Sequence, residues 1–281
     1  MLTRLFETID RAALLNTTVS RRGYSVERDL SFSQHPRLKF DAYHPDKPKA
    51  EAPLIVYFHG GSWQLSSKDD YLFIGEAFAN SGYTVLIPNY RIYPEVTFPT
   101  FVYDAATFLK WLECQPQYCD RSLVLVGHSA GALNAYLATL DPRYFREVAH
   151  DRKDLIKGLI GLAGPYDFLP LVEEEHKVIF PEDIRPMSQA VDYVAGDHPP
   201  SLLLVGAKDI TIDPKNSHSL HKALSLAGNQ SDLKVYDNLG HLGIISAFAR
   251  IFRWRAPVLN DCLAFIEKLN KEGSKFQTLV S

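Results

Sequence analysis

The chain has 281 residues, of which 46% are hydrophobic, and a formal net charge of −3. This length and composition fit one large α/β domain with a sizeable core, and the lack of net positive charge argues against nucleic acid or an anionic membrane as a partner. The three cysteines, Cys114, Cys119 and Cys262, lack the spacing of a zinc or redox site, so we expect free thiols.

The first 19 residues have apolar side chains at helical spacing, interrupted by Arg4, Glu7, Asp10 and Arg11. A signal peptide needs an unbroken apolar stretch after its basic start, so we interpret this segment as a short amphipathic helix. No later segment is long and apolar enough to span a bilayer. We expect a cytoplasmic protein without stable membrane insertion, with a peripheral amphipathic anchor as the alternative.

The rest of the chain alternates between strand and helix patterns. Residues 23–32 and 37–45 flank the turn-like SQHP and alternate in polarity, which predicts an antiparallel hairpin at a sheet edge. Continuous apolar runs, typical of parallel strands covered on both faces, occupy residues 54–58, 83–88, 122–127, 158–164 and 201–206, and a last strand is expected at 233–238. Helical patterns occupy 69–82, 100–114, 130–140 and 213–228, and a long C-terminal helix from about His241 is expected to break near Pro257.

Such alternation predicts an α/β protein with a doubly wound, mostly parallel sheet and N-terminal antiparallel edge strands, all in a single domain over residues 1–281. The rhythm fails in residues 165–200, where prolines, acidic residues and aromatic residues are scattered. Long irregular insertions often cover active sites, so we interpret this segment as a small cap at one end of the sheet.

A glycine-bearing loop, YFHGGSW over residues 57–63, follows the first predicted parallel strand. Without a Cβ in the way, glycines allow backbone N–H groups to turn toward a small anion, such as the oxyanion formed when a carbonyl is attacked. The alternative is an ordinary Gly-Gly turn between a strand and a helix.

The pentapeptide Gly127-His128-Ser129-Ala130-Gly131 lies between an apolar strand and an alanine-rich helix. It fits the G-x-S-x-G pattern, in which a nucleophilic serine projects from a turn too tight for large neighbours. The sequence therefore predicts Ser129 as a nucleophile and the N–H of Ala130 as an oxyanion donor. The alternative for Ser129 is a helix cap.

A serine hydroxyl needs a base, and the base needs an orienting acid. We predict His241 as the base because it follows the last strand on a loop that can reach back over the sheet. Asp209, just past the strand over 201–206, is the first choice for the acid, and Asp213 and Asp167 are the alternatives. The order Ser, Asp, His is that of the α/β-hydrolases.

These motifs resemble the α/β-hydrolase superfamily, in the HGG-type carboxylesterase branch that includes hormone-sensitive-lipase-like esterases and kynurenine formamidases. The resemblance extends from about residue 38 to residue 266. It is carried by HGGSW, by NYRIYPEVTFP over 89–99, by GHSAG, and by GAKDITIDPKNS over 206–217 followed by Gly240 and His241.

The resemblance implies that Ser129, Asp209 and His241 form a catalytic triad. It also implies oxyanion N–H groups from Gly61, Ser62 and Ala130, in a loop shaped by His59 and Gly60. The lipase-like members usually carry a third glycine where this chain has Ser62, whereas the formamidases carry HGGxW, which is closer to this sequence.

We therefore expect a serine hydrolase that cleaves small carboxylic esters through an acyl-enzyme and uses no metal or cofactor. Hydrolysis of an aryl formamide, such as N-formylkynurenine, is the alternative, and a non-catalytic binding protein on the same fold is a third hypothesis. The expected partner is a small ester or formamide substrate. The acidic run EEEH at 173–176 is interpreted as a solvated face, because no metal-ligand spacing accompanies it.

Overall fold

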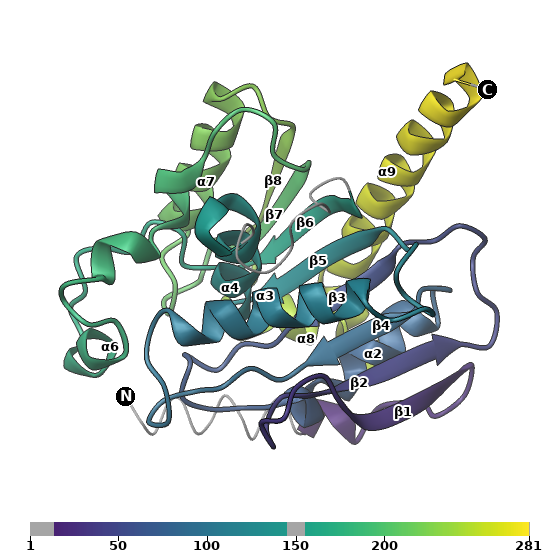
Figure 1. Ribbon diagram of the computed structural model, residues 1–281, viewed down its shortest axis with the longest axis horizontal. Coiled ribbons are helices and arrows are strands. Elements are labelled where there is room, and N and C mark those ends of the chain that lie inside the picture. Colours follow the sequence, from purple (N-terminus) through teal and green to yellow (C-terminus); the bar gives the residue numbers. More distant parts are fainter. Residues whose placement is uncertain (1–13, 145–154, 281) are drawn as a thin grey trace.

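The computed structural model describes residues 14–144 and 155–280, with side chains as far as residue 271. The first 13 residues of the predicted N-terminal helix lie outside this range, and the described chain begins with a helical turn at Leu14. The described residues form an eight-stranded sheet with helices on both faces (Figure 1).

The sheet has the strand order β1-β2-β4-β3-β5-β6-β7-β8. Strands β1 and β2 form the antiparallel hairpin that the sequence predicts, β2 is also antiparallel to β4, and all other neighbours are parallel. The strands are β1 (Tyr24–Ser31), β2 (Lys39–Pro45), β3 (Leu54–Phe58), β4 (Val85–Pro88), β5 (Leu123–His128), β6 (Ile156–Leu162), β7 (Ser201–Gly206) and β8 (Ser231–Tyr236).

Strand β6 ends two residues before the apolar run that predicts it, because Ala163 has a φ of +49° and leaves the extended conformation.

The β1–β2 hairpin contains a bulge. From Glu27 to Leu30 strand β1 advances by one residue more than its partner β2, and Asp29 within this bulge has a φ of +56°.

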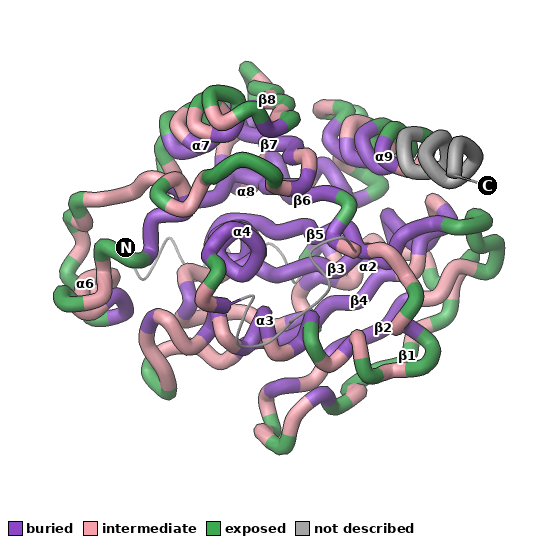
Figure 2. The backbone as a smooth tube through the Cα atoms, turned by 45° about the horizontal axis from the view of Figure 1, so that its top comes forward, coloured by how far each residue is buried: buried purple, intermediate pink, exposed green. Residues whose placement is uncertain are grey.

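Two apolar layers lie on the two faces of the sheet. Because side chains alternate along a strand, Leu54, Val56 and Phe58 of β3 pack on one layer, and Ile55 and Tyr57 pack on the other. The first layer is covered by α3 (Thr100–Glu113), α4 (Ala130–Leu140) and α7 (Lys215–Leu226), and the second by α2 (Leu72–Ala79), α8 (His241–Ser246) and α9 (Val258–Val280). The central strands and α4 are buried along their length (Figure 2).

The predicted break near Pro257 is confirmed, because α8 and the 3-10 helix η5 (Arg250–Arg255) precede α9. Between β6 and β7, where the sequence predicts an insertion, the chain forms only short helices. These are α6 (Glu174–Ile179), η3 (Arg185–Ser188) and η4 (Ala190–Tyr193). In Figure 1, α6 projects from the body of the molecule beyond the ends of the central strands.

Candidate active site

Ser129 occupies the one-residue turn between β5 and α4, with φ +53° and ψ −123°. The glycines on either side are required by close backbone contacts. A Cβ at Gly127 would lie 2.5 Å from the carbonyl oxygen of Gly131, and a Cβ at Gly131 would lie 2.2 Å from the carbonyl oxygen of Phe58. Real Cβ atoms essentially never approach backbone so closely, so even alanine is excluded and both positions require glycine.

Ser129, His241 and Asp209 are joined by hydrogen bonds. The Nε2 atom of His241 lies 3.0 Å from the Oγ of Ser129, and its Nδ1 atom lies 2.8 Å from Oδ2 of Asp209. Because a carboxylate can only accept, Nδ1 donates to Asp209 and the neutral ring presents the lone pair of Nε2 to the serine hydroxyl. This is the arrangement in which an imidazole can remove the hydroxyl proton.

Asp209 is held in place by its own loop. Its side chain is fully buried, and its Oδ1 accepts hydrogen bonds from the backbone N–H groups of Thr211 and Ile212, each at 2.9 Å. Asp213, an alternative at the sequence level, instead accepts the N–H of Lys215 at the start of α7. Asp167, the other alternative, lies on the loop after β6, where its N–H donates to Asn216. Asp209 is therefore the carboxylate that contacts the imidazole.

The loop after β3 lies directly against Ser129. A Cβ at Gly60 would be 3.3 Å from the Cβ of Ser129, and the next three residues, Gly61, Ser62 and Trp63, have φ values of +125°, +51° and +58°. Within the part of the chain that the structure describes, the backbone N–H groups of Gly61 and Ser62 donate to no protein acceptor. The N–H of Ala130, at the first position of α4, also lacks an intrahelical acceptor.

His59 forms the base of this loop and is fully buried between two tyrosines. Its ring stacks on that of Tyr90 at 4.4 Å, its Nδ1 lies 2.8 Å from the carbonyl oxygen of Gly60, and its own carbonyl oxygen accepts the hydroxyl of Tyr90. Burial lowers the pKa of His59 to about 3, so the ring is neutral at physiological pH.

A second histidine lies beside the imidazole of His241. The ring centroid of His128 is 4.8 Å from that of His241, and burial together with the neighbouring imidazole lowers the pKa of His128 well below its usual value. Sequence reasoning did not place this ring in the site. Its position next to Ser129 is visible in the sequence, but the direction of its side chain depends on the turn.

Trp63 connects the glycine loop to both α4 and the segment 165–200. Its indole Nε1 donates to Oδ1 of Asn134 at 3.0 Å, and its ring stacks on Phe101 and contacts the edge of Phe180 at a centroid distance of 4.8 Å. The N–H of Phe98 also donates to the carbonyl oxygen of Ile179 at 2.8 Å. The segment predicted as a cap therefore packs against the loop that lies beside Ser129.

Other groups in the described residues have simpler arrangements. All three cysteines are free, and no cluster of histidine, cysteine or carboxylate side chains among those residues could hold a metal ion. In the acidic run, His176 pairs with Glu173 at 2.8 Å and Lys177 pairs with Glu174 at 2.6 Å. None of the helices in the described ranges has the length and apolar character needed to cross a bilayer.

The sequence of this chain is similar to a family model and to several known proteins. The BD-FAE family model matches residues 40–224. Kynurenine formamidase of Salmo salar is 30% identical over 217 residues, covering 74% of this chain and 71% of the relative, and that of Danio rerio is 28% identical over 234 residues, covering 77% and 75%. An isoprenylcysteine alpha-carbonyl methylesterase of Arabidopsis thaliana is 25% identical over 242 residues, covering 77% of this chain but only 56% of that protein.

Solved structures share the fold at low sequence identity. Esterase B from Lactobacillus Rhamnosis superposes with a TM-score of 0.80 at 18% identity, covering 99% of this chain and 97% of the esterase. A hormone-sensitive lipase from a metagenome library gives a TM-score of 0.74 at 18% identity, covering 94% and 92%. The predicted α/β-hydrolase fold is thereby confirmed.

Proposed function

Since the chain belongs to the BD-FAE family and has the α/β-hydrolase fold, we propose that it is a serine hydrolase that cleaves small carboxylic esters. The observation that carries this proposal is the continuous chain of hydrogen bonds from Asp209 through His241 to Ser129. Esterases among the relatives and structural neighbours support the same class of reaction.

In the proposed reaction, the Oγ of Ser129 attacks the acyl carbon of the ester while His241 takes the hydroxyl proton. Asp209 stabilises the imidazolium that forms. The carbonyl oxygen becomes an oxyanion, which accepts hydrogen bonds from the backbone N–H groups of Gly61, Ser62 and Ala130. Collapse of this intermediate breaks the C–O bond, and His241 returns its proton to the departing alcohol.

The acyl-enzyme is then hydrolysed by the same groups. His241 takes a proton from water as the water attacks the acyl carbon, and Ser129 leaves as the alcohol when the proton is returned. The two buried histidines, His59 and His128, stay neutral and so add no positive charge that would compete with the imidazolium. No metal or cofactor takes part in this scheme.

The segment 165–200 has a proposed role as a cap that bounds the substrate pocket. Its Phe180 contacts Trp63, which follows two of the proposed oxyanion donors on the loop beside Ser129. The side chain of Ser62, in place of a third glycine, would narrow the acyl side of the pocket and favour short acyl groups.

The proposal is tested by comparing the wild-type protein with Ser129→Ala on p-nitrophenyl acetate. We expect kcat/KM to fall by at least about a thousandfold, because the nucleophile is lost and the fold is kept. A fluorophosphonate probe should label the wild type and leave the variant unlabelled. Ser225→Ala, on the exposed side of α7, is the matched control and should keep full activity. Equal activity of Ser129→Ala and the wild type would contradict the proposal.

A second candidate function is hydrolysis of an aryl formamide. It is favoured by Trp63 after the two glycines and by the kynurenine formamidases among the relatives. Turnover of N-formylkynurenine and of p-nitrophenyl acetate by the same preparation separates the two functions. Undetectable cleavage of the formamide would remove this candidate. If the probe failed to label folded wild-type protein, the third hypothesis, a binding protein without catalysis, would replace both.

A further inference from the structure

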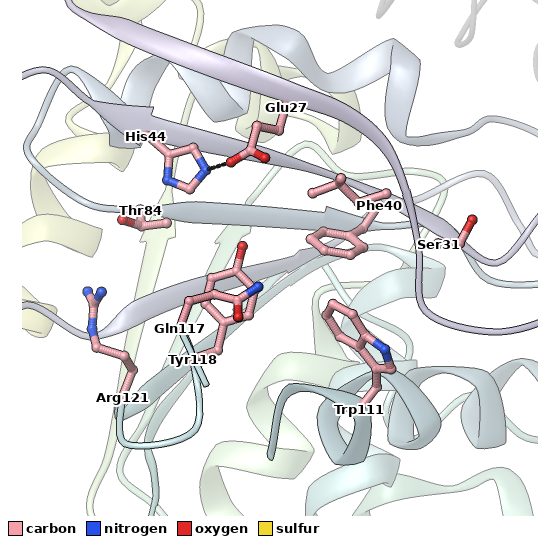
Figure 3. Close-up of a pocket in the computed structure, with 10 residues that line it drawn as sticks. Glu27, Ser31, Phe40, His44, Thr84, Trp111, Gln117, Tyr118 and Arg121 are labelled. Atoms are coloured by element: carbon pink, nitrogen blue, oxygen red, sulfur yellow. Dashed lines mark ion pairs between the residues drawn. The ribbon is translucent and has the colours of Figure 1, made fainter. Parts of the chain in front are cut away.

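A pocket lies beside the β1–β2 hairpin, away from Ser129. It has a volume of about 430 Å³ and opens between the β1–β2 hairpin and the end of α3 (Figure 3). Two of its lining residues, Thr84 and Arg121, come just before the parallel strands β4 and β5, so this end of the pocket is at the amino ends of these strands. Arg121 precedes Ser129 by eight residues along β5, which at about 3.3 Å per residue places the backbones of these two residues roughly 26 Å apart.

Arg121 brings a positive charge to this pocket without a neutralising partner. Its guanidinium is half-buried, its Nη2 donates to the carbonyl oxygen of Ala52 at 2.7 Å, and no carboxylate in the described residues forms an ion pair with it. Partial burial removes water from this guanidinium and lowers the pKa of Arg121. The pocket also contains one acid, Glu27, whose carboxylate is largely exposed and lies 2.8 Å from Nε2 of His44 rather than against Arg121.

Aromatic rings form the apolar part of the same pocket. Trp111 of α3 contacts the ring of Phe40 edge-on at 5.1 Å and lies 6.4 Å from the ring of Tyr118. In Figure 3, Tyr118 and Gln117 lie between Arg121 on one side and Trp111 and Phe40 on the other. A ligand in this pocket would therefore meet, at one end, a cation whose other N–H groups donate to no acceptor in the described part of the chain, and aromatic surfaces at the other end.

We propose that this pocket binds a small aromatic carboxylate, with its carboxylate at Arg121 and its ring against Tyr118 and Trp111. An arginine fork matches a carboxylate in shape and charge, and the amide of Gln117 adds a further donor. The volume of the pocket is within the range of small-molecule sites. This binding is separate from the proposed hydrolysis, because none of the groups involved belongs to the Ser129 site.

The test uses indole-3-acetate and its neutral amide, indole-3-acetamide, as probes in calorimetric titrations of the full chain. We expect the carboxylate to bind at least tenfold more tightly than the amide. Arg121→Gln should weaken carboxylate binding at least tenfold and leave amide binding unchanged. Because Arg121→Gln also removes the hydrogen bond to Ala52, a second variant, Gln117→Glu, places a like charge beside the ligand without disturbing that contact and should weaken binding similarly.

Hydrolysis of p-nitrophenyl acetate serves as the folding control, and both variants should retain it. Equal binding of the acid and the amide, or unchanged affinity in both variants, would overturn the proposal. Competitive inhibition of the ester reaction by indole-3-acetate, with a constant equal to its dissociation constant, would place the ligand at Ser129 instead. Absence of ester hydrolysis in the wild type would count only against the proposed function.

Discussion

Replacing Ser129 by glycine is expected to abolish turnover and yet make the protein more stable than replacing it by alanine. The reason is the backbone of this residue, which has φ +53° and ψ −123°. A side chain held in such a sparsely populated conformation costs about 1–3 kcal/mol. Alanine keeps the Cβ and therefore this strain, whereas glycine adopts the conformation freely.

The difference in the free energy of unfolding between the two variants is the sum of two opposing effects. Glycine relieves the strain but adds roughly 0.4–1 kcal/mol of chain entropy to the unfolded state. The net gain of Ser129→Gly over Ser129→Ala is about 1 kcal/mol. Both variants lose the hydroxyl that hydrogen bonds to His241, so this contact cancels in the comparison.

Urea unfolding followed by far-UV circular dichroism measures this difference, and thermal unfolding should show a rise of about 2 °C in Tm for the glycine variant relative to the alanine variant. Neither variant should hydrolyse p-nitrophenyl acetate. A glycine variant that is equal to or less stable than the alanine variant would refute the argument that the turn is strained.

Three further predictions concern ionisable side chains. Asp209→Asn should lower kcat for p-nitrophenyl acetate by roughly 10⁴-fold, because an amide at this position no longer holds His241 in its reactive tautomer. A steady-state kcat within tenfold of the wild-type value would contradict this prediction. Burial lowers the pKa of His59 to about 3 and that of His128 well below its usual value, so each histidine must gain a proton on unfolding below pH 6.5. Stability should therefore fall between pH 7.5 and pH 5 in urea titrations, by about 2 kcal/mol for His59 alone and further for His128, and a flat profile would exclude this linkage. Lys68→Met should lower the free energy of unfolding by about 3 kcal/mol in urea titrations, because the fully buried Asp41 loses an ion pair at 2.8 Å. An unchanged urea midpoint would show that the remaining contacts of Asp41 are sufficient to stabilise it.

Much of the sheet could be predicted because strands covered on both faces have continuous apolar sequences. The bounds of β3 and β7 coincide with their apolar runs, since every residue in them is buried. The predicted and observed strand bounds agree less well where contacts with distant segments determine the end of a strand. The end of β6 depends on the positive φ of Ala163, and nothing in an apolar run indicates such a residue.

The arrangement of Ser129, Asp209 and His241 was predictable in outline, because the carboxyl ends of parallel strands meet at one edge of a sheet. The choice among three aspartates depended on loop geometry, which sequence spacing leaves open. Other features have no local signal. The left-handed backbone of Ser62 and Trp63, the bond from Trp63 to Asn134 and the burial of Lys68 all arise from contacts between distant segments.

The bulge in β1 also bears on how these molecules behave at high concentration. An outer strand with free backbone groups can pair with the same strand of another molecule, and this is a common route to aggregation. Here the outer strand is bent at Asp29, whose N–H donates to Asp41 and whose carboxylate pairs with Lys68 at 2.9 Å. The bulge interrupts the regular row of backbone donors and acceptors along this outer edge, so it opposes pairing with a second copy, and the buried lysine that pairs with Asp29 helps to hold the bulge.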